Sequence, residues 1–195
     1  MRGESHVAMN LATGGIVAGT GLLLLNVDTF PEVKIIVEYI KDFLFDDGGV
    51  MPQPLFIGLG ILLYMLGSLL PDIDTPYSTL GRIIHLPFEH RTWTHAIWAP
   101  LALMIAGIWV RLLFWLGFGI LVHDFFDSFS ASGIDWFYPH KRRKSKTFKL
   151  YHTGEPSEYV FGTIVFLTTI AYWVLVLQMS FDIFGKISAL FGKYS

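Results

Sequence analysis

The stretch AIWAPLALMIAGIWVRLLFWLGFGILVHDFF, residues 96–126, decides the fold. It is a long apolar block in which Arg111 is the only lysine or arginine. A single helix of this length would extend about 46 Å at a rise of about 1.5 Å per residue, whereas the hydrocarbon core of a bilayer is about 30 Å thick. The stretch is therefore too long for one membrane helix. We predict two spanning helices, over residues 95–110 and 112–129, that turn near Arg111.

Further apolar stretches of membrane-helix length recur along the chain, since a span needs about 20 mostly apolar residues. They cover residues 7–27, 54–70 and 157–178. No small-x-small cleavage motif follows the first of them, so we interpret it as a helix rather than as a signal peptide. Between the first two, Pro31–Phe45 places apolar residues at helical spacing among charged ones. This pattern is typical of an amphipathic helix at the membrane interface.

The composition also indicates a membrane protein. Hydrophobic residues make up 53% of the chain and charged residues 15%, which is too little charge to cover the surface of a soluble domain. The sequence therefore predicts one all-α transmembrane domain, residues 1–195, with about five membrane helices and one interfacial helix. The net charge of −2 argues against a nucleic-acid partner. Membrane lipids are the expected partners.

The distribution of basic residues predicts the orientation in the membrane. With five spans, the N-terminus and the loops 71–95 and 130–156 lie on one face. That face carries most of the lysines and arginines, including the basic run 141–149. The positive-inside rule then assigns this face, with the N-terminus, to the cytoplasm.

A set of histidines and unpaired acids stands near helix ends on this same predicted face. They are Glu4, His6, Asp72, Asp74, His90, His95, His123, Asp124, Asp127, Glu155 and Glu158. A charged side chain at the centre of a membrane helix costs about 2.5–3.5 kcal/mol on insertion scales. Ionisable residues beside such apolar runs indicate a function, and their convergence at one membrane face predicts a functional site.

The local spacings at this site suit a metal ion. His123 and Asp127 are four residues apart, on one helix face, and Asp72 and Asp74 form an Asp-x-Asp pair that we expect on an extended turn after Pro71. The chain has no cysteine, which excludes thiolate ligands. Imidazole with carboxylate favours Zn, with Mn, Fe or Mg as alternatives, as one or two ions. Taken alone, each pair also has a plainer interpretation, as a helix cap, an interfacial group or a hydrogen-bonded pair.

Four stretches of the chain resemble the YdjM-like family, whose members are described as LexA-binding, inner-membrane-associated proteins with an inferred metal-dependent hydrolase activity. The stretches are Glu4-Ser5-His6, Leu70-Pro71-Asp72-Ile73-Asp74-Thr75-Pro76, His90-Arg91-Thr92-Trp93-Thr94-His95 and 119–127, which continues to Gly133 and Trp136. The resemblance implies a multi-pass protein of the prokaryotic inner membrane with a divalent-metal site. No motif in this chain carries LexA binding.

Carried over position by position, the resemblance implies a set of metal ligands. These are His6, Asp72, Asp74, His95, His123 and Asp127, with His90 as a further candidate. In this interpretation His90 or Glu158 acts as a general base or an additional ligand, and Arg91 steadies an anionic group. Three other histidines, His85, His140 and His152, lie in polar loops and are expected to be bystanders.

The leading functional hypothesis is a hydrolase that cleaves a phosphoester or other ester of a lipid at the cytoplasmic interface, where two adjacent ions could act together. The alternative is a metal-stabilised membrane scaffold or binding protein without turnover, in which the protein saturates the ion. An ion carrier is disfavoured, because the spans lack ionisable residues at mid-depth apart from Arg111.

Overall fold

The computed structural model of the chain is helical. It describes residues 8–9, 11–16, 19–20, 31–46, 48–78, 80–84, 86, 89–140 and 148–181. Its elements are α2 (Pro31–Phe45), α3 (Gln53–Leu69), η1 (Pro71–Asp74), η2 (Trp93–His95), α4 (Trp98–Ala106), α5 (Arg111–Ser128) and α6 (Pro156–Phe181). Residues 8–9, 11–16 and 19–20 are helical as well. Within this part of the chain an isolated bridge joins Ser130 and Tyr151, and no strand forms. The predicted all-α class is confirmed.

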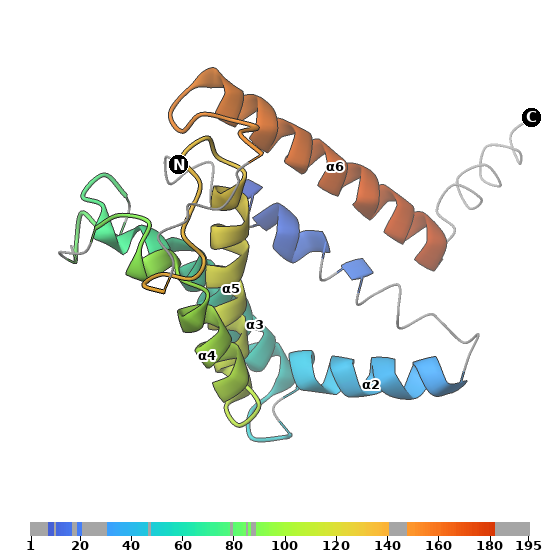
Figure 1. Ribbon diagram of the computed structural model, residues 1–195. Helices are drawn as coiled ribbons and strands as arrows, with labels where there is room; N and C mark the ends of the chain where they lie inside the picture. Colours follow the sequence, from blue (N-terminus) through green and yellow to red (C-terminus); the bar gives the residue numbers. More distant parts are fainter. Residues whose placement is uncertain are drawn as a thin grey trace, which may run out of the picture.

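Helices α3 and α5 pack side by side and form the centre of the molecule (Figure 1). Two glycines allow their backbones to touch. A Cβ added to Gly67 would lie 2.2 Å from the Leu116 carbonyl oxygen, and one added to Gly119 would lie 2.1 Å from the Tyr64 carbonyl oxygen. Small residues at helix contacts serve this purpose in membrane proteins. The close approach brings the last turn of α3 against the polar end of α5.

Replacement of Gly119 by Ala is expected to destabilise the protein, by at least the roughly 1–3 kcal/mol that overpacking costs. The clash is with a backbone oxygen, which cannot rotate away. The measurement is thermal unfolding in detergent. Gly58→Ala is the matched control, because a Cβ at Gly58 on α3 meets nothing within 4 Å. Equal melting temperatures for the two variants would contradict the α3–α5 contact.

Helix α4 and helix α5 form a hairpin, but α4 is short. Its 9 residues extend about 14 Å at about 1.5 Å each, less than half of a bilayer core. The turn occupies residues 107–110, close to the predicted position. It is tight at Gly107, where an added Cβ would lie 2.7 Å from the Phe114 Cβ. The predicted helix over 95–110 is thus divided between η2, α4 and this turn.

Two helical segments in the described part of the chain, rather than about five, are long and apolar enough to cross a membrane. They are Gln53–Asp74 and Pro156–Gln178. Helix α4 is too short, and α5 carries three charged residues, Arg111, Asp124 and Asp127, within its 18 residues. The predicted span 7–27 lies only partly within the described residues.

The C-terminal end of helix α2, the predicted amphipathic helix, lies beside the end of α3 that is remote from the polar end of α5, and the rest of α2 extends away from the hairpin (Figure 1). Val37 is buried, whereas Ile36 and Tyr39 are exposed. Arg111, at the start of α5, donates a 2.7 Å hydrogen bond to the Asp42 carbonyl and another to the Asp46 carbonyl. A basic side chain at a helix C-terminus satisfies carbonyls that lack partners within the helix. This contact joins α2 to the hairpin.

Helix α6 begins beside the polar end of α5 and runs away from the hairpin (Figure 1). Near its start, Phe161 packs against Phe126, Phe129 and Tyr151, with ring centroids 5.1–6.4 Å apart. Further along, α6 exposes many large apolar side chains, including Ile164, Leu167, Ile170, Val174 and Leu175. A helix that is apolar all round is suited to lipid surroundings.

Candidate metal centre

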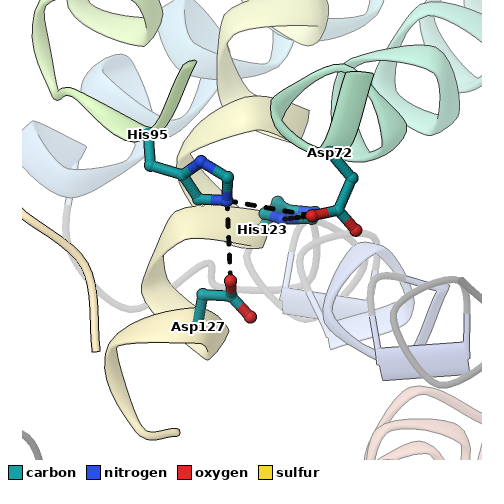
Figure 2. A group of neighbouring side chains, drawn as sticks. All are labelled: Asp72, His95, His123 and Asp127. Atoms are coloured by element: carbon teal, nitrogen blue, oxygen red, sulfur yellow. Dashed lines mark ion pairs between the residues drawn. The ribbon is translucent and has the colours of Figure 1, made fainter. Parts of the chain in front are cut away.

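Four side chains converge where η1, η2 and the end of α5 meet (Figure 2). Asp72, His95, His123 and Asp127 each offer one ligand atom, and these atoms all lie within 4.8 Å of one another. His95 Nε2 is 3.5 Å from Asp127 Oδ2 and 3.9 Å from Asp72 Oδ1, and His123 Nε2 is 3.7 Å from Asp72 Oδ1. All four side chains are buried. We refer to them as the four-residue group.

The backbone explains how α5 and η1 contribute to this group. His123 and Asp127 are one helical turn apart on α5 and project toward the same point (Figure 2). After Pro71, the chain forms the 3₁₀ helix η1 instead of the extended turn that we predicted. With three residues per turn, the side chains of Asp72 and Asp74 diverge. Only Asp72 joins the four-residue group.

Both imidazoles are oriented by hydrogen bonds to their Nδ1 atoms. His123 Nδ1 lies 2.7 Å from the Ser68 carbonyl oxygen. Because a carbonyl can only accept, Nδ1 carries the proton and Nε2 presents its lone pair to the group. His95 Nδ1 lies 3.0 Å from Thr94 Oγ1, and this hydroxyl donates its own proton to Asp74 Oδ2. Such outer partners fix the tautomer and ring position of metal-binding histidines.

Asp74 and His90 lie behind His95 rather than in the four-residue group. Asp74 Oδ1 is 2.7 Å from His90 Nδ1, and Asp74 Oδ2 accepts the Thr94 hydroxyl. Asp74 is buried, whereas the side chain of His90 is 38% exposed. Asp74, His90 and His95 form a second group of ligand-type atoms. A second ion there would have to replace the existing contact between Asp74 and His90.

Arg91 borders the four-residue group. Its Nη2 is 3.1 Å from Asp127 Oδ2, and its Nη1 donates to Ser130 Oγ at 3.1 Å and to the Gly133 carbonyl at 3.3 Å. The backbone of Arg91 has φ of 65°, which is uncommon for any residue but glycine. These contacts hold Arg91 in that conformation. The residue predicted to steady an anionic group therefore also neutralises Asp127.

Helices α5 and α6 each contribute a further buried carboxylate outside the four-residue group. Glu158, at the start of α6, is 1% exposed, and its Oε2 accepts a 2.6 Å hydrogen bond from the Gly154 amide. Glu158 Oε1 makes no hydrogen bond with the described residues. Asp124 is fully buried beside His123, and neither of its oxygens is hydrogen-bonded within the described part of the chain. Asp124 is one of the polar residues that were predicted to converge at this face, but it was not predicted to be a metal ligand.

Tyr151 closes the site on the side of α6. Its ring is fully buried, and its hydroxyl donates a 3.0 Å hydrogen bond to the Phe126 carbonyl. Burial, reinforced by the negative charge of Asp127, raises the pKa of Tyr151 well above its ordinary value. The phenol therefore stays neutral and acts as a structural donor.

The structure describes two of the four remaining predicted histidines. His6 and His85 fall outside the described residues. His140 and His152 are exposed and belong to neither group of ligand-type atoms, in keeping with their expected role as bystanders.

A cavity of about 480 Å³ leads from the surface to the four-residue group. Asp72, His90 and Arg91 are among the residues that line it, together with Ser78 and Thr153. Asp72 is thus the member of the group that a molecule entering this cavity would meet. We refer to it as the entry cavity.

The donor set fits a divalent metal ion. His95 is fully buried, yet its Nε2 makes no hydrogen bond within the described residues and faces two carboxylates. Burying such a nitrogen beside acceptors is unfavourable unless a proton or a cation lies between them. Two imidazoles and two carboxylates form a ligand set that Zn and other first-row metals accept.

Comparison with known proteins agrees with the motifs. No curated protein and no solved structure matches the chain. The profile of one family, described as YdjM inner membrane protein, matches residues 1–184 and so includes every residue of the four-residue group. The chain belongs to the YdjM family of inner membrane proteins.

Proposed function

We propose that this protein is a metal-dependent hydrolase that cleaves a phosphoester or other ester of a lipid at the cytoplasmic face of the inner membrane. The observation that carries the proposal is the buried four-residue group beside an entry cavity that reaches Asp72. A structural metal ion, whose coordination positions are all filled by protein ligands, needs no such access. A hydrolytic site needs access for water and substrate.

Each residue has a role in this proposal. Asp72, His95, His123 and Asp127 would hold the ion, with Zn favoured. A divalent ion supplies Lewis-acid activation of water and of an ester or phosphoryl oxygen. His90 lines the entry cavity, and its Nδ1 contacts the Asp74 carboxylate. An imidazole oriented in this way by a carboxylate can accept a proton at Nε2, so His90 is our candidate general base.

Exposed aromatic side chains around the polar end support an interfacial location. Trp93, Trp98 and Phe137 are each about half exposed, and Tyr77 is 84% exposed. Tryptophan and tyrosine gather at the headgroup level of membranes. We therefore propose that the entry cavity opens among lipid headgroups. A reporter fused near Lys144 should report the cytoplasm, and one fused near Asp46 the opposite side.

Hydrolysis should depend on the four-residue group. The full chain, purified in detergent, is assayed on phosphodiester and lipid-ester substrates before and after chelation, and its metal content is measured. We expect activity to disappear on chelation, to return with Zn or Mn, and to be lost in His95→Ala. The exposed His152→Ala serves as the matched histidine control. Full activity in His95→Ala would contradict the proposal.

A metal-stabilised scaffold is the second candidate, and one contact favours it. Four protein donors can satisfy a tetrahedral ion completely, and Arg91 already neutralises Asp127. X-ray absorption on the metal-loaded protein discriminates between the two. A catalytic ion retains a water or an exchangeable ligand, whereas a structural ion has only protein ligands.

A further inference from the structure

We infer that two apolar loops beside the entry cavity insert into the lipid leaflet, so that a lipid reaches the cavity sideways from the bilayer. The first loop carries Tyr77, Ile83 and Ile84, and the second carries Phe148 and Leu150. We refer to them as the rim loops. The inference rests on the proposed lipid hydrolysis for the identity of the ligand, and it adds the route by which that ligand arrives.

The side chains of the rim loops are large, apolar and exposed. Ile83 is 78% exposed and Phe148 is 73% exposed, and the other three side chains are each more than half exposed. A single apolar side chain on a surface is ordinary, whereas several at one place indicate a surface that binds a membrane or a partner. The question is therefore what covers them.

Both rim loops adjoin the entry cavity. Tyr77 lines the cavity directly. Thr153 and Gly154 line it too, and they follow the second rim loop closely along the chain. The mouth of the cavity is thus built from the two segments that carry the exposed apolar side chains. Whatever binds the rim loops also meets this mouth.

The position of the rim loops along the chain favours a lipid leaflet as the partner. Among the described residues, the segments long and apolar enough to cross a membrane are Gln53–Asp74 and Pro156–Gln178. Tyr77 follows the end of the first segment, and Leu150 precedes the start of the second. At no more than about 3.6 Å per residue, Tyr77 lies within about 11 Å and Leu150 within about 22 Å of these ends.

The two segment ends lie on the same side of the molecule. Asp74 belongs to η1, which meets the polar end of α5, and α6 begins beside that end (Figure 1). The first rim loop follows η1 and extends to the side of the α3–α5 pair (Figure 1). A leaflet that surrounds the spanning segments would therefore meet both rim loops near its headgroups.

Basic side chains among the apolar ones complete an interfacial pattern. Arg82 precedes Ile83 directly, and Lys149 lies between Phe148 and Leu150. Both basic side chains are exposed. Basic groups next to apolar ones contact lipid phosphates while the apolar groups enter the boundary of the acyl chains. The charge of the rim loops thus complements the phosphate layer of a leaflet.

Both rim loops are held in place by contacts within the protein. In the first, the Ile84 amide donates a 2.9 Å hydrogen bond to the Leu80 carbonyl. In the second, the Phe148 ring stacks on Phe129 with ring centroids 5.4 Å apart, and the Leu150 amide donates to the Phe129 carbonyl at 3.0 Å. Because the loops are already ordered, insertion costs little conformational entropy.

Spin labelling tests the insertion, because the chain has no cysteine. Ile84→Cys, Leu150→Cys and Tyr77→Cys each provide a single thiol for a nitroxide label on the full chain in phospholipid nanodiscs. Relaxation of the label by oxygen, which concentrates in lipid, is compared with relaxation by a water-soluble nickel chelate. We expect all three labels to give oxygen-to-nickel ratios several-fold above that of a label in water.

Two matched variants supply the reference values. Leu62→Cys places the label at an exposed position of α3 within a membrane-spanning segment, as the lipid reference. His152→Cys places it at an exposed polar position near the second rim loop, as the water reference. If Ile84→Cys or Leu150→Cys fails to fold, Ile83→Cys or Phe148→Cys takes its place on the same loop.

The outcomes separate the inference from the proposed function, since the measurement needs neither metal nor turnover. A water-like ratio at either rim loop would overturn the insertion and leave the apolar side chains to a protein partner. A water-like ratio at Tyr77→Cys alone would overturn the sideways route. Lipid-like ratios in a protein without metal-dependent hydrolysis would reject the function and keep the insertion.

Discussion

His123→Ala is expected to lower the affinity of the protein for its divalent ion by more than about 100-fold, since changes to outer partners alone cost roughly 10–100-fold. The substitution removes one of four ligand-type atoms and leaves His95 as the one imidazole of the four-residue group beside Asp72 and Asp127. The affinity is measured by competition with a chromophoric chelator on the protein in detergent. The proposed hydrolysis should disappear in parallel.

The control for this prediction is a histidine of the same chemistry in a different setting. His152 is exposed and belongs to neither group of ligand-type atoms, so His152→Ala should bind metal as the wild type does. Thermal unfolding of the metal-free proteins shows whether His123→Ala merely fails to fold. A folded His123→Ala that retains wild-type metal affinity would show that α5 contributes no imidazole ligand.

Thr94→Val is expected to weaken metal binding by roughly 10–100-fold without removing a ligand. The hydroxyl links His95 Nδ1 to the Asp74 carboxylate, and valine has nearly the same shape but no donor or acceptor. His95 would then lose the contact that fixes its tautomer, and Asp74 would lose a donor. The same chelator competition measures the effect.

Thr168→Val is the matched control for this change. Thr168 is exposed on α6, and its hydroxyl donates only to the Ile164 carbonyl in its own helix. We expect its metal affinity to equal that of the wild type. If Thr94→Val also leaves the affinity unchanged, the chain of contacts from Asp74 to His95 has no role in metal binding.

Sequence spacing was sufficient where the ligands share one regular element. His123 and Asp127 are a turn apart on a long helix, and the structure places both in the four-residue group. The helical pattern of Pro31–Phe45 likewise predicted α2. In these cases the period of the helix alone determines which side chains lie together.

The spacing was insufficient where the backbone between ligands is irregular. The Asp-x-Asp pair gave no sign of whether the chain after Pro71 is extended or 3₁₀-helical, and this difference separates Asp74 from Asp72. The hairpin turn was predicted near Arg111, but the length of α4 was not, because apolar residues continue through the turn at 107–110. Composition cannot distinguish a short apolar helix followed by an apolar turn from a complete span.

One of the supporting groups could not be identified from side-chain chemistry. The Ser68 atom that orients His123 is a backbone carbonyl, which every residue has. It reaches His123 only because Gly67 and Gly119 let α3 and α5 touch.

The segment between Asp72 and His95 has a consequence for how the ion is gained and lost. Closing a flexible loop costs entropy, and these two ligands stand at the ends of one. In this protein, hydrogen bonds within the segment close much of the loop without an ion. The Ser78 hydroxyl donates to the Asp72 carbonyl at 2.7 Å, and the Leu86 amide donates to the Ile73 carbonyl at 3.2 Å. An arriving ion therefore meets ligands that are already gathered. Removal and return of the metal should then be reversible without refolding of the chain.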